Sequence, residues 1–305
     1  YVWGNVLPVM KKTDFNLINL ETTLTRSVKQ VSKTFNFKAL PDRVECLTLA
    51  NISVVNLANN HILDYTEEGL LETIATLKHQ HIEYTGAGYN SADAEKAVRL
   101  TCKEISLGIL GLTDNEPGWK AGRHHPGTNY VDIDNAHDRD AALTAIQNLK
   151  REVNCCIVSI HWGPNMRIKP SKKFIAFAHA MIEHGADIIH GHSAHIFQGI
   201  EIYRDKLILY DTGDFVDDYS VDPLLRNDRS FFFICSITKE GIRSLQLVPV
   251  LIDNFQVNLA AGEDYQWCIH RMQQLSKEFG TEVSNSGEVV FRNRLESEKP
   301  ASVIE

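Results

Sequence analysis

Short apolar runs that alternate with helix-like segments constrain the fold of this chain more than any other feature. Runs typical of buried strands lie at 15–20, 52–57, 105–112, 155–160 and 187–190, and a short edge strand is predicted at 82–84. Segments with the apolar spacing of amphipathic helices separate them, at 41–51, 66–79, 136–152 and 171–184. Such an alternation of strands and helices predicts an α/β protein.

From residue 199 onward the pattern changes to strands that follow one another. Strands are predicted at 199–203, 207–211, 230–238 and 244–252, and a closing helix at 266–279. The sheet is therefore expected to gain antiparallel strands late in the chain. In the helix over 66–79, Thr66 is expected to cap the first turn, and residues 286–305 are expected to be loose.

Polar side chains stand directly after several of the predicted strands. Glu21 follows 15–20, the sequence A-N-N-H ends at His61 after 52–57, and His161 follows 155–160. The sequence H-G-H-S-A-H occupies 190–195, and D-T-G-D ends at Asp214 after the strand at 207–211. In α/β sheets ligands bind at the carboxyl ends of the strands, so we expect these residues to share one rim.

Histidine together with carboxylate and amide oxygens suits Zn, Mn, Fe or Mg. A metal there would lower the pKa of a bound water, and a neighbouring histidine could protonate a leaving group. Two alternatives stay open. Asn60-His61 could form a structural turn, and Asp214 could belong to a helix-capping cluster with Asp217 and Asp218.

The composition excludes several classes of protein. The 305 residues include 31 Lys and Arg against 39 Asp and Glu, a net charge of −8 without any long basic run. This balance argues against binding to nucleic acid or to anionic membranes. No apolar run is long enough for a membrane helix. The six cysteines have no paired spacing, are interpreted as buried free thiols, and favour a cytoplasmic location.

Several longer stretches carry a resemblance to a known family. They are YVWGNVLP, NLETTLT, NLANNHILDYTEEGLLETIATL, GAGYN, SIHWGPN, HGHSAHIFQGIE and LILYDTGDFVDDY, and they extend from residue 1 to about 235. The chain resembles the CapA family of poly-γ-glutamate capsule synthesis proteins, within the calcineurin-like metallophosphoesterase superfamily. The resemblance implies a four-layer α/β/β/α sandwich over 1–252, followed by a C-terminal helix and tail over 253–305. It also implies that the family's opening G-D-x-M motif lies upstream of Tyr1.

The resemblance assigns roles to residues on the rim. His61 takes the general-acid position, and Asp214 is expected to orient a histidine. The family's last motif has histidines two apart, whereas His192 and His195 are three apart, so His190 stays an alternative ligand. The implied ligands of one or two divalent ions are Glu21, Asn60, His161, His192 and His195.

The resulting hypothesis is a metal-dependent hydrolase of poly-γ-glutamate or capsule polymer metabolism that cleaves a phosphoester or a γ-glutamyl amide bond. Its substrate would be an anionic polymer or a small anionic or peptidic molecule, which Arg226 and Arg229 would contact unless they form salt bridges to Asp222 and Asp228. The alternative is a non-catalytic, polymer-binding accessory subunit of a capsule synthesis or export complex, with other capsule synthesis proteins as partners.

Overall fold

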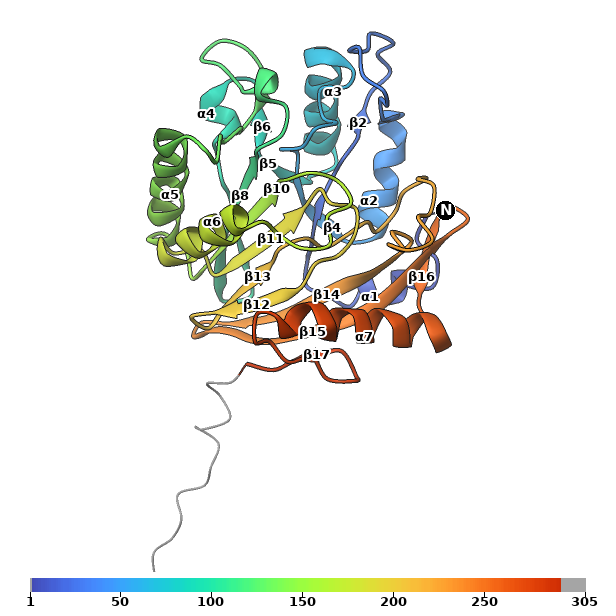
Figure 1. Cartoon of the computed structure of the whole chain (residues 1–305). Helices are drawn as coiled ribbons and strands as arrows, with labels where there is room; N and C mark the ends of the chain where they lie inside the picture. Colours follow the sequence, from blue (N-terminus) through green and yellow to red (C-terminus); the bar gives the residue numbers. More distant parts are fainter. Residues whose placement is uncertain (1, 292–305) are drawn as a thin grey trace, which may run out of the picture.

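A computed structural model describes residues 2–291 and shows a mixed α/β protein with several sheets (Figure 1). The largest sheet has six strands in the order β12-β13-β11-β10-β8-β7. Its strands are β7 (Val98–Cys102), β8 (Ile105–Thr113), β10 (Cys155–His161), β11 (Ile188–His192), β12 (Ile200–Tyr203) and β13 (Lys206–Leu209). Strands β8, β10, β11 and β13 run parallel, whereas β7 and β12 pair antiparallel at the two edges.

Two smaller sheets complete the framework. The first is parallel, in the order β1-β4-β5, and consists of β1 (Asn16–Asn19), β4 (Ile52–Asn56) and β5 (Glu83–Thr85). The second is antiparallel and consists of β14 (Arg229–Thr238), β15 (Gly241–Asp253), β16 (Gln256–Leu259) and β17 (Glu288–Val289). Short two-stranded pairs are β2 (Thr23–Leu24) with β3 (Lys38–Ala39) and β6 (Ala87–Gly88) with β9 (Gly127–Thr128).

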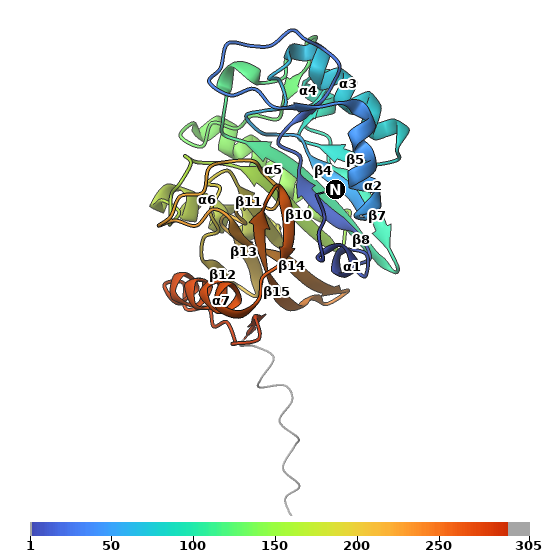
Figure 2. The ribbon, with the colours of Figure 1, turned by 90° about the vertical axis from the view of Figure 1, so that its right-hand side faces the viewer.

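The helices cover these sheets on their outer faces. Helices α5 (Ala136–Lys150) and α6 (Lys172–Glu183) pack on one face of the six-stranded sheet. The other face buries its apolar side chains against β14, β15 and α7 (Gly262–Lys277). Figures 1 and 2 both show α7 on the outer side of β14 and β15. The remaining helices are α1 (Leu7–Met10), η1 (Pro41–Val44), α2 (Glu45–Leu49), α3 (Thr66–His79), α4 (Ser91–Ala94) and η2 (Pro117–Trp119).

The predicted helices and strands are present in the predicted order, with differences at their ends, and several short elements between them were not predicted. Helix α3 has the predicted bounds because Leu70, Ile74 and Leu77 form a buried stripe within one hydrophobic core cluster. The expected cap at Thr66 is wrong: Thr66 is already the first helical residue, with φ +61°, and no side chain caps the helix. The preceding turn runs directly into the helix, since the Thr66 amide donates to the Leu63 carbonyl at 2.9 Å.

The region after residue 252 contributes to the same core. Strand β16, which the sequence analysis missed, pairs with β15, and Met272 of α7 is fully buried against the second sheet. Helix α7 begins four residues earlier than predicted, at Gly262. The expected looseness of residues 286–305 falls mostly on 292–305, which lie outside the described residues. Among residues 2–291, no helix is long and apolar enough to cross a membrane.

Candidate functional site

The residues predicted at the strand ends do gather at one rim. Strands β10 and β11 are parallel neighbours, and their last residues, His161 and His192, lie side by side in the register. The Nδ1 atoms of these two histidines are 3.0 Å apart, and Oε2 of Glu21 lies 3.8 Å from Nδ1 of His161. The rim follows from topology, because the carboxyl ends of parallel strands meet at one edge of a sheet.

The paired histidines are deeply buried. Burial lowers the pKa of both His161 and His192 well below the usual range, so both rings are neutral at neutral pH. Oγ of Ser159 lies 3.1 Å from Nε2 of His192 and 2.9 Å from Nδ1 of His190. Ser159 thus lies between His190 and His192, and His192 also contacts His161.

The carboxyl group of Glu21 lies in surroundings that disfavour its ionised form. Its Oε2 accepts a hydrogen bond from Asn19 Nδ2 at 2.9 Å, and its side chain keeps 21% of its surface exposed. Burial, with smaller contributions from Asp214 and Asp211, raises its pKa from 4.5 to about 8. Without a neighbouring cation the Glu21 carboxyl is therefore mostly protonated at neutral pH.

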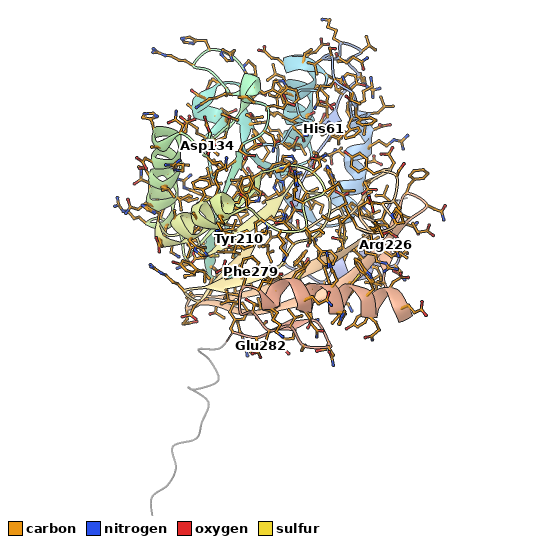
Figure 3. The ribbon with its side chains drawn as sticks, viewed as in Figure 1. His61, Asp134, Tyr210, Arg226, Phe279 and Glu282 are labelled. Atoms are coloured by element: carbon orange, nitrogen blue, oxygen red, sulfur yellow. The ribbon has the colours of Figure 1, made fainter. Side chains whose placement is uncertain are left out.

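His61 lies beside these residues and is held by a carboxylate that the sequence analysis gave no role. Asp64 Oδ2 lies 2.6 Å from His61 Nδ1 and accepts from the Phe37 amide at 2.7 Å, and Asp64 Oδ1 accepts from Lys33 at 3.0 Å. Burial nevertheless lowers the pKa of His61, because it outweighs the attraction of Asp64. Figure 3 shows His61 in the upper half of the molecule, apart from Arg226 at its right-hand edge. The signal that could have identified Asp64 was its spacing of three residues from His61.

His195 has a carboxylate partner of its own, as expected for Asp214. Its Nδ1 lies 2.8 Å from Asp214 Oδ1. Asp211 accepts hydrogen bonds from the amides of Ala194 at 2.7 Å and Gly213 at 2.9 Å, which fastens the two loops together. Burial raises the pKa of Asp214 well above its ordinary value, and the contact with Asp217 adds to this effect. The His195–Asp214 pair therefore sits on a fixed loop junction.

Four of the predicted rim residues keep a buried polar atom without a partner in the described part of the chain. These atoms are Glu21 Oε1, Asn60 Oδ1, His161 Nε2 and Asp214 Oδ2. Buried polar groups in proteins are nearly always hydrogen-bonded, and an unmet one costs free energy. Carboxylate, amide oxygen and imidazole nitrogen are the donors that Zn, Mn, Fe or Mg accept, so these residues fit such an ion chemically. Within residues 2–291, however, no three His, Cys, Asp or Glu side chains already converge on one point.

The two arginines predicted to bind substrate are engaged in ion pairs. Arg226 forms two hydrogen bonds to Asp228, at 2.7 and 2.6 Å. Arg229 is buried, and one of its terminal nitrogens lies 2.5 Å from Asp264 Oδ1. These contacts support the salt-bridge alternative: Asp228 is one of the two predicted partners and pairs with Arg226, whereas Arg229 pairs with Asp264, which was not predicted. Asp264 lies in the first turn of a helix far along the chain, so its pairing was not visible in the sequence.

Comparison of the whole chain with known proteins identifies its family. A family model described as "Bacterial capsule synthesis protein PGA_cap" matches residues 1–219, which is more than two thirds of the chain. The chain belongs to this family of capsule synthesis proteins. The predicted resemblance to CapA proteins is confirmed by relatives at about 30% identity.

Relatives of the chain include proteins of mycobacteria and of Bacillus species. The chain is 35% identical to a "Probable polyglutamine synthesis accessory protein" of Mycobacterium tuberculosis, over 92% of this chain and 78% of that one. It is 31% identical to the "Capsule biosynthesis protein CapA" of Bacillus anthracis, over 83% of this chain and 61% of the other. The "PGA biosynthesis protein CapA" of Bacillus subtilis is 30% identical, over 82% and 64%. The chain thus spans less than two thirds of the Bacillus proteins.

Two solved structures resemble the chain more distantly. A hypothetical protein from Thermus thermophilus has a TM-score of 0.46 at 12% sequence identity. The match covers 83% of this chain and 88% of the Thermus chain. The NAD nucleotidase of Haemophilus influenzae has a TM-score of 0.39 at 16% identity, over 73% of this chain and 41% of that one.

Proposed function

We propose that this protein is a metal-dependent hydrolase of poly-γ-glutamate or capsule polymer metabolism, acting on a phosphoester or a γ-glutamyl amide bond. The observation that carries the proposal is a set of four buried oxygen and nitrogen atoms on the rim that have no hydrogen-bond partner and could bind a metal ion. Three belong to expected metal ligands, and the fourth belongs to Asp214, which was expected to orient a histidine. The names of the relatives supply the polymer context. We also propose that the helix, sheet, sheet and helix layers form the four-layer sandwich expected from the resemblance.

The residues of the rim divide into two roles. Glu21, Asn60 and His161, together with His192 and His195, would hold one or two divalent ions such as Mn, Fe, Zn or Mg. When bound, such an ion lowers the pKa of a coordinated water and polarises the bond to be cleaved. Five candidate ligands would be enough for either one ion or two.

His61 would move the proton. Asp64 accepts hydrogen bonds from Lys33 and from the Phe37 amide, so its 2.6 Å contact with His61 places a hydrogen on Nδ1 of His61 and leaves Nε2 as the atom free to exchange a proton. Asp64 also fixes the orientation of the ring, and Phe37 stacks on the ring with centroids 4.1 Å apart. This geometry supports proton donation to a leaving group through Nε2.

The test is the metal content of the purified protein by elemental mass spectrometry. We expect about one or two ions per chain, and their loss in the double variant His161→Ala, His192→Ala. The matched control replaces two exposed histidines, His137 and His270, by alanine and should retain the metal. Retention of metal in the rim double variant would refute the assignment of this site. Metal-loaded protein is then assayed with aryl phosphoesters and γ-glutamyl peptides.

A second candidate is a non-catalytic accessory subunit that binds anionic polymer. Two observations favour it: the described residues contain no preassembled metal cluster, and the mycobacterial relative is named an accessory protein. The two candidates differ in one measurement. A protein that retains poly-γ-glutamate on a column but binds no metal after reconstitution is the accessory subunit.

A further inference from the structure

Tyr219 lies on the rim, although neither the sequence analysis nor the proposed reaction gives it a role. Its ring meets the ring of His195 edge-on with centroids 4.9 Å apart, and it meets the ring of Phe37 edge-on at 5.8 Å. Phe37 in turn stacks on His61 at 4.1 Å. Tyr219 and Phe37 therefore connect a candidate metal ligand to the candidate proton donor, and both line the same cavity as Glu21.

The loop that carries Tyr219 is held by its own hydrogen bonds. The Tyr219 amide donates to Asp217 Oδ1 at 3.2 Å. Asn227 closes the loop, because its Oδ1 accepts from the Asp222 amide at 2.8 Å and its Nδ2 donates to the Ser220 carbonyl at 3.3 Å. Asp and Asn side chains that bond to nearby backbone groups fix turns in this way. The position of the Tyr219 ring is thus set without a regular helix or strand.

The hydroxyl group of Tyr219 is a hydrogen-bond donor that the protein does not use. It has no hydrogen-bond partner among residues 2–291. The side chain is half-buried, and the hydroxyl oxygen itself stays accessible. A phenol is protonated at neutral pH and can donate its hydrogen. The Tyr219 hydroxyl is therefore free to bind a molecule that enters the cavity.

The reaction proposed above needs such a donor. Hydrolysis of a phosphoester or an amide places growing negative charge on an oxygen of the substrate, and a fixed hydrogen-bond donor stabilises this charge. The two arginines expected to contact substrate are paired with aspartates, and Lys33 is paired with Asp64. A neutral phenol also does not repel a metal ion, whereas an additional cationic side chain would. Tyr219 meets both requirements.

We propose that Tyr219 is a substrate-binding residue of this rim, and that its hydroxyl donates a hydrogen bond to the negatively charged oxygen of the group under attack. This assignment rests on the proposed hydrolase function and adds a donor that the ligand set lacks. The contacts with His195 and Phe37 hold the ring, so the hydroxyl is positioned before the substrate arrives.

The test compares Tyr219→Phe with the wild type by titration calorimetry, because phenylalanine keeps the ring and removes only the hydroxyl. The probes are inorganic phosphate and the dipeptide γ-glutamyl-glutamate, which represent the two bonds that the rim is proposed to cleave. We expect the probe that the wild type binds more tightly to bind Tyr219→Phe about 10–100-fold more weakly, because a hydrogen bond to a charged group is lost. Metal content and the urea midpoint should not change.

The matched control is Tyr89→Phe, which removes the hydroxyl of an exposed tyrosine beside Lys78 and outside this cavity. It should bind both probes as the wild type does. Where hydrolysis is found, kcat/KM should fall by about 10²–10³-fold in Tyr219→Phe and stay unchanged in Tyr89→Phe.

Three results would overturn the assignment. They are equal affinities of Tyr219→Phe and the wild type for both probes, no binding of either probe to either protein, and a lower affinity that accompanies loss of metal or of stability. The titrations are run on metal-loaded protein and again in EDTA, so that failure of the proposed function is recognised separately. A wild type that takes up no metal refutes the hydrolase, and an affinity in EDTA that depends on the hydroxyl would still support Tyr219 as a residue that binds anions.

Discussion

Replacing Glu21 by glutamine tests whether the rim is built for a cation. Burial raises the pKa of Glu21 from 4.5 to about 8, so the folded, metal-free protein holds a proton that the unfolded chain releases near pH 4.5. The folded state therefore binds more protons between these two values, and its stability falls as the pH rises from 4.5 through 8. Glutamine keeps the shape and cannot ionise, so this loss is absent in Glu21→Gln.

The size of the effect follows from the two pKa values. The difference between 4.5 and 8 corresponds to about 5 kcal/mol in the free energy of unfolding. This figure is an upper limit, because water reaches the 21% of the side chain that is exposed. We expect metal-free Glu21→Gln to exceed the wild type by about 2–4 kcal/mol at pH 8 and to equal it near pH 4.5.

Urea unfolding in EDTA at pH 4.5, 6, 7 and 8 measures this difference directly. A divalent cation reverses the order, because it favours the ionised carboxylate and stabilises only the wild type through Glu21. Glu95→Gln, at an exposed glutamate, is the control for loss of a charge. Parallel pH curves for Glu21→Gln and the wild type would refute the reasoning, as would equal stabilisation of both by Mn or Zn.

Three further substitutions examine the other parts of the site. His161→Ala should reduce the bound metal measured by elemental mass spectrometry, and an unchanged content would exclude His161 as a ligand. His61→Ala should leave the metal in place and lower kcat by about 10²–10⁴-fold on whichever substrate is hydrolysed, whereas loss of metal would make His61 a ligand. Gly191→Ala should cost about 1–3 kcal/mol in urea unfolding, because its Cβ would lie 2.1 Å from the Tyr210 carbonyl oxygen. Gly118→Ala, which meets no atom within 4 Å, is its control, and equal stability of the two variants would contradict this packing argument.

Local patterns determined the order of helices and strands. Periodicity reports which face of a segment is buried, and this is why α3 could be predicted to the residue while the edge strands β7 and β16 were missed. Thr66 shows the limit of local rules, since the turn that holds His61 and Asp64 sets the start of the helix instead of a side-chain cap. The strand-end residues could be placed on one rim because parallel strands share a carboxyl edge.

The sequence by itself thus determined the fold class and the chemical composition of the rim. Only the tertiary structure decided which atoms meet. In the folded chain His192 contacts His161, and His195 contacts Asp214. The two histidines differ because positive φ angles at Ser193 and His195 turn the chain out of the strand. The tertiary structure also revealed the buried polar atoms without partners, since these arise where segments distant in the sequence come together.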